Sequence, residues 1–250
     1  MQIASHKSEL FKEPKDRLIF ALDVPTSAEA ISLIAELKDE VGLFKVGLEL
    51  IAAAGVPRMA AILGDFEAPW FLDIKAKDIP NTVGATIKAA VAQGASMINI
   101  HADNSLAAIR AAAQNKDRAT LLGVSVLTSI DPVEAELLLG RSVRAQVLYC
   151  ARNLVLGGAD GIICSPQELE MFRDYPELKG LIKITPAIRL PGQPQNDQRR
   201  TMTPAEAIEK DVDAIVVGRA ISKPQEGKSC ADMARLIVEE ITQGLEARNA

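Results

Sequence analysis

Short apolar runs alternate with longer amphipathic stretches along the chain from Leu18 onward. The eight apolar runs cover 18–24, 43–48, 70–75, 97–101, 120–127, 161–164, 181–188 and 214–217. Helix-like stretches lie between or after them, at 27–40, 82–93, 105–115, 204–209 and 231–246. Such alternation is typical of parallel strands joined by helices. Eight units predict an α/β fold of the (β/α)8 TIM-barrel type, with a doubly wound open sheet as the weaker alternative.

The sequence predicts a single domain. Its 250 residues suffice for one α/β barrel, and no Ser/Gly/Pro-rich linker divides them. We expect an N-terminal arm over 1–17 and the barrel catalytic domain over 18–250. The long interval between Leu127 and Gly161 indicates more than one helix after the fifth strand.

The charge and composition of the chain limit the classes of partner and metal site that it can have. Lys plus Arg number 28 against 33 Asp plus Glu, a net charge of −5, so neither nucleic acid nor an anionic membrane is expected as a partner. The first seventeen residues are rich in charge and lack the apolar core of a signal peptide, and no apolar run reaches the roughly 18 residues that span a bilayer. Three widely separated cysteines fit reduced thiols in the cytoplasm. Two histidines exclude a His-rich metal site, although an all-carboxylate site remains open.

The third apolar run ends in charged residues, which is unusual for a strand. Asp73 and Lys75 are two residues apart, so they are predicted to point to the same side of the strand. Asp78 follows in a turn that Pro80 marks, and the pleat does not fix its direction. A solvated loop whose charges pair for solubility is the alternative. The apolar residues that flank Asp73 and Lys75 favour a catalytic role.

Other polar residues lie at the ends of the predicted strands, where TIM barrels carry their active sites. Asp23 ends the first run, Lys45 lies within the second, Thr128 follows the fifth, and Gly218 and Arg219 follow the eighth. Any one of them could simply begin a loop. Because all of them are expected at the same rim of the barrel, we predict that they form one site with Asp73 and Lys75.

The loops after the seventh and eighth strands of this fold often bind phosphate through backbone N–H groups and an Arg fork. Here Arg189 follows the seventh run, and a Pro/Gln/Gly-rich loop leads to Arg199 and Arg200. We expect Arg219 to bind phosphate, whereas Arg199 and Arg200 are more typical of solvated surface charge. His101, at the end of the fourth run, is predicted to be a hydrogen-bonded barrel residue, and Cys164 a core residue.

In their order along the chain, these motifs resemble the orotidine 5′-phosphate decarboxylase family from Leu18 to about Ser222. The matching segments are Ala21-Leu22-Asp23, Lys45-Val46-Gly47, Asp73 and Lys75 with Asp78-Ile79-Pro80-Asn81-Thr82, Leu127-Thr128-Ser129, Thr185-Pro186 with Ile188-Arg189, Asp197-Gln198-Arg199 and Val217-Gly218-Arg219. The Asp/Lys/Asp spacing alone is shared with sugar-phosphate decarboxylases and synthases of the same superfamily. The continuation Ile79-Pro80-Asn81-Thr82 separates them.

The resemblance implies a catalytic array. Lys75 would be the proton donor, flanked by Asp73 and Asp78, and Lys45 would complete an alternating Lys-Asp-Lys-Asp set. Asp78, and with it Ile79 and Thr82, would enter from the partner subunit of a homodimer with shared active sites.

The resemblance also implies the substrate contacts. Asp23, Lys45 and Thr82 would contact the ribose hydroxyls, Thr128 the pyrimidine, and Gln198, Arg189 and Arg219 the phosphate. Substrate contacts are also expected from three further residues, Ile79, Pro186 and Gly218. The chain departs from the family pattern at Ala187, where Gly is usual, at Lys77, where many bacterial members have His, and at Asp103-Asn104, where a pair of small residues is usual.

The reaction that the resemblance implies is the decarboxylation of orotidine 5′-phosphate to UMP and CO2, the last step of de novo pyrimidine biosynthesis. Loss of CO2 from carbon 6 of the ring leaves a carbanion with no conjugated carbonyl, and no sequence motif suggests pyridoxal phosphate or thiamine. We therefore expect catalysis without cofactor or metal, in which the Lys75 ammonium stabilises the developing charge. The alternatives are a magnesium-dependent sugar-phosphate decarboxylase or aldolase of the same superfamily, and a non-enzymatic barrel that senses a nucleotide.

Overall fold

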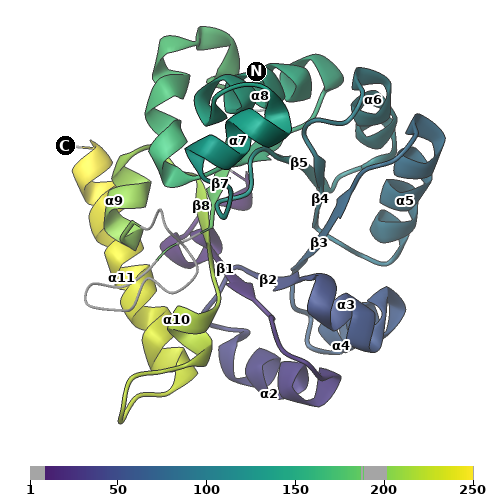
Figure 1. The fold of residues 1–250 in the computed structure, drawn as a ribbon. Coiled ribbons are helices and arrows are strands. Elements are labelled where there is room, and N and C mark those ends of the chain that lie inside the picture. Colours follow the sequence, from purple (N-terminus) through teal and green to yellow (C-terminus); the bar gives the residue numbers. More distant parts are fainter. Residues whose placement is uncertain (1–8, 187, 189–201, 250) are drawn as a thin grey trace.

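Eight parallel strands close into a barrel in the computed structural model, which describes residues 9–186, 188 and 202–249 (Figure 1). The strands follow one another in sequence order, and β8 pairs with β1 to close the ring. They are β1 (Leu18–Ala21), β2 (Leu43–Val46), β3 (Trp70–Ala76), β4 (Met97–His101), β5 (Thr120–Val124), β6 (Gly161–Ile163), β7 (Ile182–Thr185) and β8 (Ala214–Val217). The TIM-barrel prediction is confirmed, and the open-sheet alternative is wrong.

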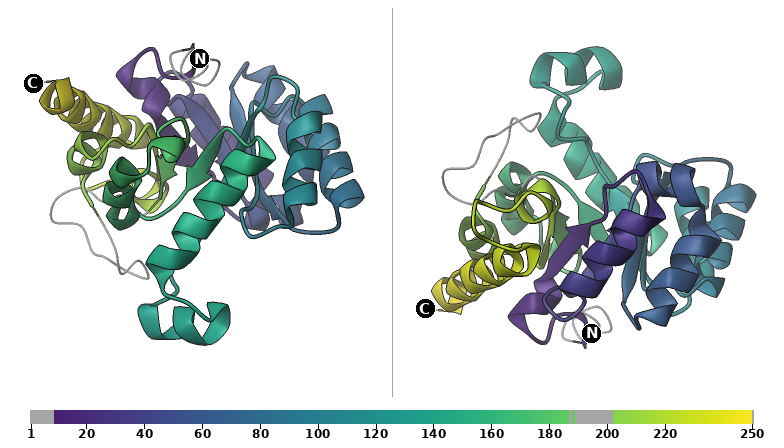
Figure 2. Two further views of the ribbon diagram at one scale, coloured as in Figure 1. Left: turned by 90° about the horizontal axis from the view of Figure 1, so that it is seen from above. Right: turned by 90° about the horizontal axis from the view of Figure 1, so that it is seen from below.

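Helices surround the barrel (Figures 1 and 2). The α-helices are α2 (Ser27–Leu37), α3 (Leu48–Ala54), α4 (Val56–Asp65), α5 (Pro80–Ala92), α6 (Leu106–Asn115), α7 (Pro132–Leu139), α8 (Val143–Gly157), α9 (Pro204–Glu209), α10 (Arg219–Ser222) and α11 (Cys230–Asn249). Shorter 3-10 helices are η1 (Pro14–Arg17), η2 (Pro166–Asp174) and η3 (Pro176–Leu178). Side-chain oxygens of Thr26, Ser105, Asp131 and Ser142 accept hydrogen bonds from backbone N–H groups at the starts of four α-helices, which satisfies donors that a helix leaves unpaired. None of the described helices is long and apolar enough to cross a membrane.

Several strands are shorter than predicted. The second apolar run does not end in strand, because Gly47 caps α3 and Leu48 begins that helix. The first and fifth runs continue beyond β1 and β5 into loops, where Leu22 and Val126 are still buried. An apolar run in this sequence therefore indicates buried residues, and these include loop residues near the mouth of the barrel as well as residues paired in the sheet. The interval after β5 holds two helices, as predicted, and α7 stands away from the barrel at one end of α8 (Figure 2).

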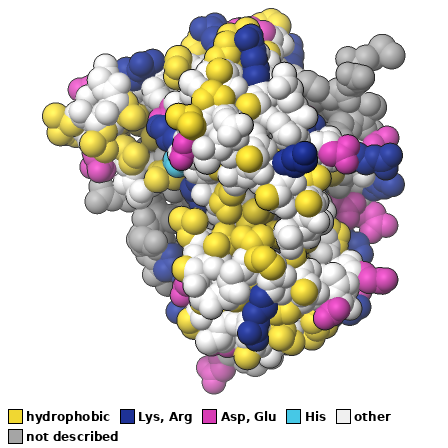
Figure 3. Space-filling model, turned by 90° about the vertical axis from the view of Figure 1, so that its right-hand side faces the viewer, with side chains coloured by type: hydrophobic (Ala, Val, Ile, Leu, Met, Phe, Trp, Pro, Cys, Tyr) yellow, Lys and Arg dark blue, Asp and Glu magenta, His cyan; other side chains and the backbone are white. Residues whose placement is uncertain are grey.

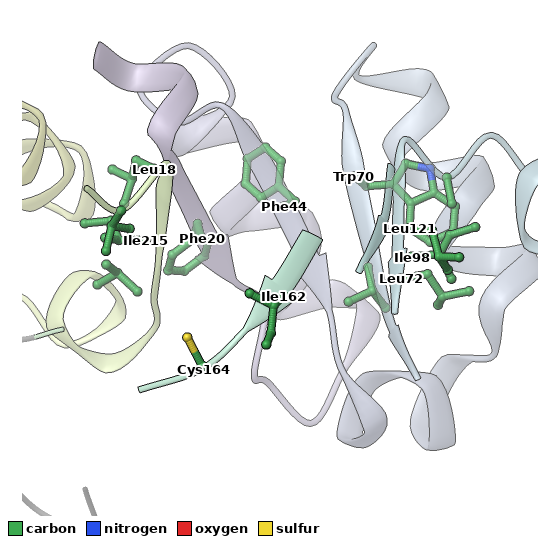
Figure 4. Close-up of a cluster of buried hydrophobic side chains, with 14 of the residues drawn as sticks. Leu18, Phe20, Phe44, Trp70, Leu72, Ile98, Leu121, Ile162, Cys164 and Ile215 are labelled. Atoms are coloured by element: carbon green, nitrogen blue, oxygen red, sulfur yellow. The ribbon is translucent and has the colours of Figure 1, made fainter. Parts of the chain in front are cut away.

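Alternate strand residues build two apolar layers. Ile19, Phe71, Met97 and Leu122 fill the barrel interior, and Phe11 from the segment before the barrel packs with them. Residues of the opposite parity face the helices and form a larger outer core, which contains Leu18, Phe20, Phe44, Trp70, Leu72, Ile98, Leu121, Ile162, Cys164 and Ile215 (Figure 4). Each large side chain that is fully buried stabilises the fold by roughly 1.5–3 kcal/mol. These layers hold the strand ends in fixed positions.

Candidate active site

A cavity of about 300 Å³ opens at the C-terminal ends of the strands. Residues from all eight strands or the loops that follow them line it: Ala21, Asp23, Lys45, Phe71, Asp73, Lys75, Asn99, Val124, Val126, Leu127, Thr128, Ile163, Cys164, Pro186, Val216, Gly218 and Arg219. The structure thus brings together Asp23, Lys45, Asp73, Lys75, Thr128, Pro186, Gly218 and Arg219, eight of the residues that the sequence predicted for the site. A charged floor meets an apolar wall formed largely by residues of and after β5.

Four charged side chains form a continuous chain across the floor of this cavity. Lys45 Nζ lies 3.1 Å from Asp23 Oδ1 and 3.1 Å from Asp73 Oδ2. Lys75 Nζ lies 2.6 Å from the other oxygen of Asp73, Oδ1. Gly47 leaves room for this arrangement, because a Cβ at that position would lie 3.0 Å from Lys45 Nζ. The order Asp-Lys-Asp-Lys therefore rests on the loop after β1 and on residues of β2 and β3.

Neighbouring charges keep the buried side chains of Asp73 and Lys45 ionised. Burial alone would raise the pKa of Asp73, but Lys45 and Lys75, together with hydrogen bonds from Lys75 and Asn99, hold that pKa below its ordinary value. Burial alone would lower the pKa of Lys45, but Asp73 and Asp23 raise it above its ordinary value. At neutral pH Asp73 is therefore an anion and Lys45 a cation.

Lys75 has an unusual backbone conformation. Its φ of 51° lies in the left-handed region, which costs a residue other than glycine about 1–2 kcal/mol. The pairing of β3 with β4 is irregular here, because Leu72 pairs with Ile98 and Ala76 with Ile100. Three residues of β3, at 73–75, therefore lie opposite Asn99 alone. The structure places both Asp73 and Lys75 at the cavity. Simple strand alternation is the wrong reason for this, since a bulge redirects the chain at Lys75.

Asn99 is a buried site residue that the sequence analysis did not select. Its side chain has 0 % exposure and lies in the middle of β4. Nδ2 donates to Asp73 Oδ1 at 2.6 Å, and Oδ1 accepts from the backbone N–H of Lys75 at 2.8 Å. The available signal was an amide inside the otherwise apolar stretch Met97-Ile98-Asn99-Ile100.

The comparisons with known proteins agree with this geometry. Residues 16–233 match the model of the orotidine 5′-phosphate decarboxylase / HUMPS family. The chain belongs to this family. An orotidine 5′-phosphate decarboxylase of Anaeromyxobacter dehalogenans is 41 % identical over 213 residues, covering 84 % of this chain and 92 % of the relative. That of Moorella thermoacetica is 36 % identical over 240 residues, covering 91 % and 92 %.

Solved structures of similar proteins share the barrel. The crystal structure of orotidine 5′-phosphate decarboxylase from Lactobacillus acidophilus superposes with a TM-score of 0.77 at 29 % identity, covering 90 % of this chain and 98 % of that one. An uncharacterised conserved protein from Geobacillus kaustophilus gives a TM-score of 0.74 at 25 % identity, covering 90 % and 99 %. The family match and the shared barrel are thus consistent with a catalytic cavity at the charged floor.

Three residues that the family resemblance assigns to the site lie outside the cavity of their own chain. Asp78, Ile79 and Thr82 are exposed and are not among the described residues that line it. Asp78 Oδ1 accepts a hydrogen bond from Ile79 N at 2.6 Å, next to the start of α5. Arg189 and Gln198, expected at the phosphate, lie outside the described residues, as does Ala187.

Two departures from the family pattern occur as a pair. Lys77 Nζ lies 2.6 Å from Asp103 Oδ2, so the lysine after β3 and the aspartate after β4 neutralise each other. His101 is half-buried, its Nδ1 lies 3.9 Å from Asp103 Oδ1, and burial lowers its pKa. His101 is not among the described residues that line the cavity. Cys164 is buried, as predicted, although it also lines the cavity.

Proposed function

We propose that this chain decarboxylates orotidine 5′-phosphate to UMP and CO2 without a cofactor, as the last step of de novo UMP synthesis. The observation that carries the proposal is the Lys75 ammonium, held 2.6 Å from the Asp73 carboxylate at a cavity of about 300 Å³. Its relatives of 36–42 % identity that carry the same activity in their names support it. The activity is that of a carbon–carbon lyase.

The chemistry uses the charges of the array. When the bond between carbon 6 and the carboxylate breaks, the electron pair stays on carbon 6 and CO2 leaves. The Lys75 ammonium stabilises that charge more strongly in the transition state than in the substrate, and then gives its proton to carbon 6. Water returns a proton to the resulting amine. Asp73 keeps the ammonium in place, while Lys45 keeps Asp73 ionised.

The remaining cavity residues supply the substrate contacts in this proposal. Asp23 and Lys45 bind the ribose hydroxyls, and Thr128 binds the pyrimidine at the apolar wall. Pro186, Gly218 and Arg219 lie after β7 and β8, where this fold commonly binds phosphate. Arg189 and Gln198 belong to the same phosphate site in this proposal.

A homodimer with shared sites is part of the proposal. Asp78, Ile79 and Thr82 follow the C-terminal end of β3 and are exposed, with Ile79 at 66 %. Other exposed apolar side chains follow the same ends of β2 and β5, namely Leu48, Leu127, Val133, Leu137 and Leu138. Hydrophobic side chains also lie on the surface of the projection at the upper left of Figure 3, where α7 stands. A second copy that covers this rim would bury these groups and bring Asp78 to the neighbouring Lys75.

A cytoplasmic location is also part of the proposal. Cys150, Cys164 and Cys230 are free thiols, and thiols stay reduced in the cytoplasm.

Chelation separates this function from the magnesium-dependent alternative. The purified protein is treated with excess EDTA, its metal content is verified, and loss of the orotate absorbance is followed after orotidine 5′-phosphate is added. We expect the same rate with and without chelator, because Lys75 supplies the positive charge. Activity that disappears with EDTA and returns with Mg²⁺ would favour the sugar-phosphate type of chemistry. Nucleotide binding without turnover would identify a sensor.

Arg219→Ala tests the phosphate contact. The substitution removes a charge-assisted hydrogen bond worth roughly 1.5–3 kcal/mol, so we expect kcat/KM to fall about ten- to two-hundredfold. The fall should be much smaller for a substrate that lacks the phosphate. Equal losses for both substrates would show that Arg219 does not meet the phosphate.

A further inference from the structure

We propose that Asn99 is a positioning residue for the decarboxylation, which fixes the Lys75 ammonium and the Asp73 carboxylate relative to the substrate carbon. The inference rests on the proposed function. It concerns a side chain to which the family resemblance assigned no role, and which would not itself touch the reacting atoms.

The position of Asn99 in the sheet is the first argument. The bulge leaves residues 73–75 of β3 opposite Asn99 alone, so regular strand pairing cannot satisfy the backbone of this segment. The side-chain oxygen of Asn99 accepts the Lys75 N–H at 2.8 Å and replaces a missing sheet bond. Asn99 thereby stabilises the left-handed backbone that turns Lys75 toward the cavity.

The chemistry of the amide is the second argument. The same side chain donates Nδ2–H to Asp73 Oδ1 at 2.6 Å, on the oxygen that also receives Lys75 Nζ. Asn99 thus connects the backbone of the proton donor to the carboxylate that holds its ammonium. A carboxylate in this place could accept but not donate, and it would repel Asp73. A hydrocarbon side chain could do neither.

The surrounding loops show that the segment is anchored from both sides. Asn104 Nδ2 donates to the backbone oxygens of Ala76 and His101, both at 2.9 Å. Asn153 of α8 in turn holds the oxygens of Ala102 and Asn104, both at 2.9 Å. The end of β3 after Lys75 is therefore fixed independently of Asn99. Loss of the Asn99 amide should release Lys75 and Asp73 without releasing the loop.

The test compares two variants with a matched control. Asn99→Leu has a similar size and lacks both hydrogen bonds. Asn99→Asp keeps the acceptor but regains the donor only when the new carboxyl is protonated. The control is Gln146→Leu, which also replaces a buried amide by leucine, in α8, where Gln146 Nε2 contacts only Cys150 Sγ, at 3.6 Å, among its side-chain hydrogen bonds in the described chain.

For Asn99→Leu we expect kcat to fall about a hundredfold, as for a misplaced catalytic group, while the Kd for UMP changes little. Gln146→Leu should keep wild-type kcat. For Asn99→Asp, the ratio of its kcat to that of the wild type should be highest at acid pH. The ratio should fall as pH rises and the introduced carboxyl ionises, because only its protonated form donates to Asp73.

A near-normal kcat in Asn99→Leu, or a change confined to KM, would overturn the inference. If Asn99→Leu does not fold, a pH-independent kcat ratio for Asn99→Asp would overturn it equally. Labelling of Lys75 with an acylating reagent, mapped by mass spectrometry, separates this inference from the proposed function because it needs no turnover. We expect Lys75 to react several-fold faster in Asn99→Leu than in Gln146→Leu. Unchanged labelling would contradict positioning even if the wild-type protein decarboxylates, and failure of the wild type to decarboxylate would contradict only the proposed function.

Discussion

We expect Lys75→Ala to abolish decarboxylation and to leave product binding almost unchanged. The substitution removes both the charge that stabilises the carbanion and the proton that it receives, so kcat should fall at least about 10⁴-fold. Asp73 keeps Lys45 at 3.1 Å and Asn99 at 2.6 Å, so its buried charge remains compensated and the barrel should still fold. The measurements are single-turnover decarboxylation and the Kd for UMP by calorimetry.

Lys77→Ala is the matched control for this prediction. Lys77 lies two residues further on, pairs with Asp103 at 2.6 Å, and is not among the described residues that line the cavity. Its loss should leave kcat near the wild-type value, since surface ion pairs contribute little. Turnover within about tenfold of wild type in Lys75→Ala would show that another group donates the proton.

Mixing two inactive variants should restore activity if the active sites are shared. Lys75→Ala and Asp78→Ala are each expected to be nearly inactive as homodimers. In a mixed dimer one site carries both substitutions, but the other combines intact Lys75 with intact Asp78. With random exchange half the dimers are mixed, so activity should rise toward about a quarter of the wild-type value.

A second mixture controls for effects of exchange itself. Lys75→Ala and Asp73→Ala should not restore each other, because Lys75 Nζ and Asp73 Oδ1 meet within one chain at 2.6 Å. Mass spectrometry verifies exchange in both mixtures. If Lys75→Ala with Asp78→Ala recovers nothing although exchange is complete, Asp78 serves its own subunit and the shared-site proposal is wrong.

The barrel was predictable because its signal is repeated eight times, as apolar runs separated by amphipathic stretches. The ends of the strands were less predictable, because Leu22 and Val126 are buried in loops just as strand residues are buried in the sheet. Hydrophobicity reports burial, whereas pairing depends on the neighbouring strand. The same distinction explains why Leu48, exposed at the start of α3, was assigned to a strand.

The charged floor was predictable from residue types at strand ends, since Asp23, Lys45, Asp73 and Lys75 all meet there. The role of Asn99 was not, because it depends on the register between β3 and β4. Only the structure reveals that a bulge leaves Lys75 opposite this amide. Long-range pairing of this kind leaves no local mark apart from one polar residue in an apolar strand.

The central claim is that Lys75 decarboxylates orotidine 5′-phosphate without a metal. The fate of the substrate carboxylate tests this claim most directly. Orotidine 5′-phosphate labelled with ¹³C at the carboxylate is incubated with the EDTA-treated protein, and labelled CO2 and UMP are quantified together. The account predicts equal amounts of both products, at a rate that EDTA does not change and that Lys75→Ala abolishes. Substrate that stays intact with the wild-type protein, or labelled CO2 formed equally fast by Lys75→Ala, would contradict it.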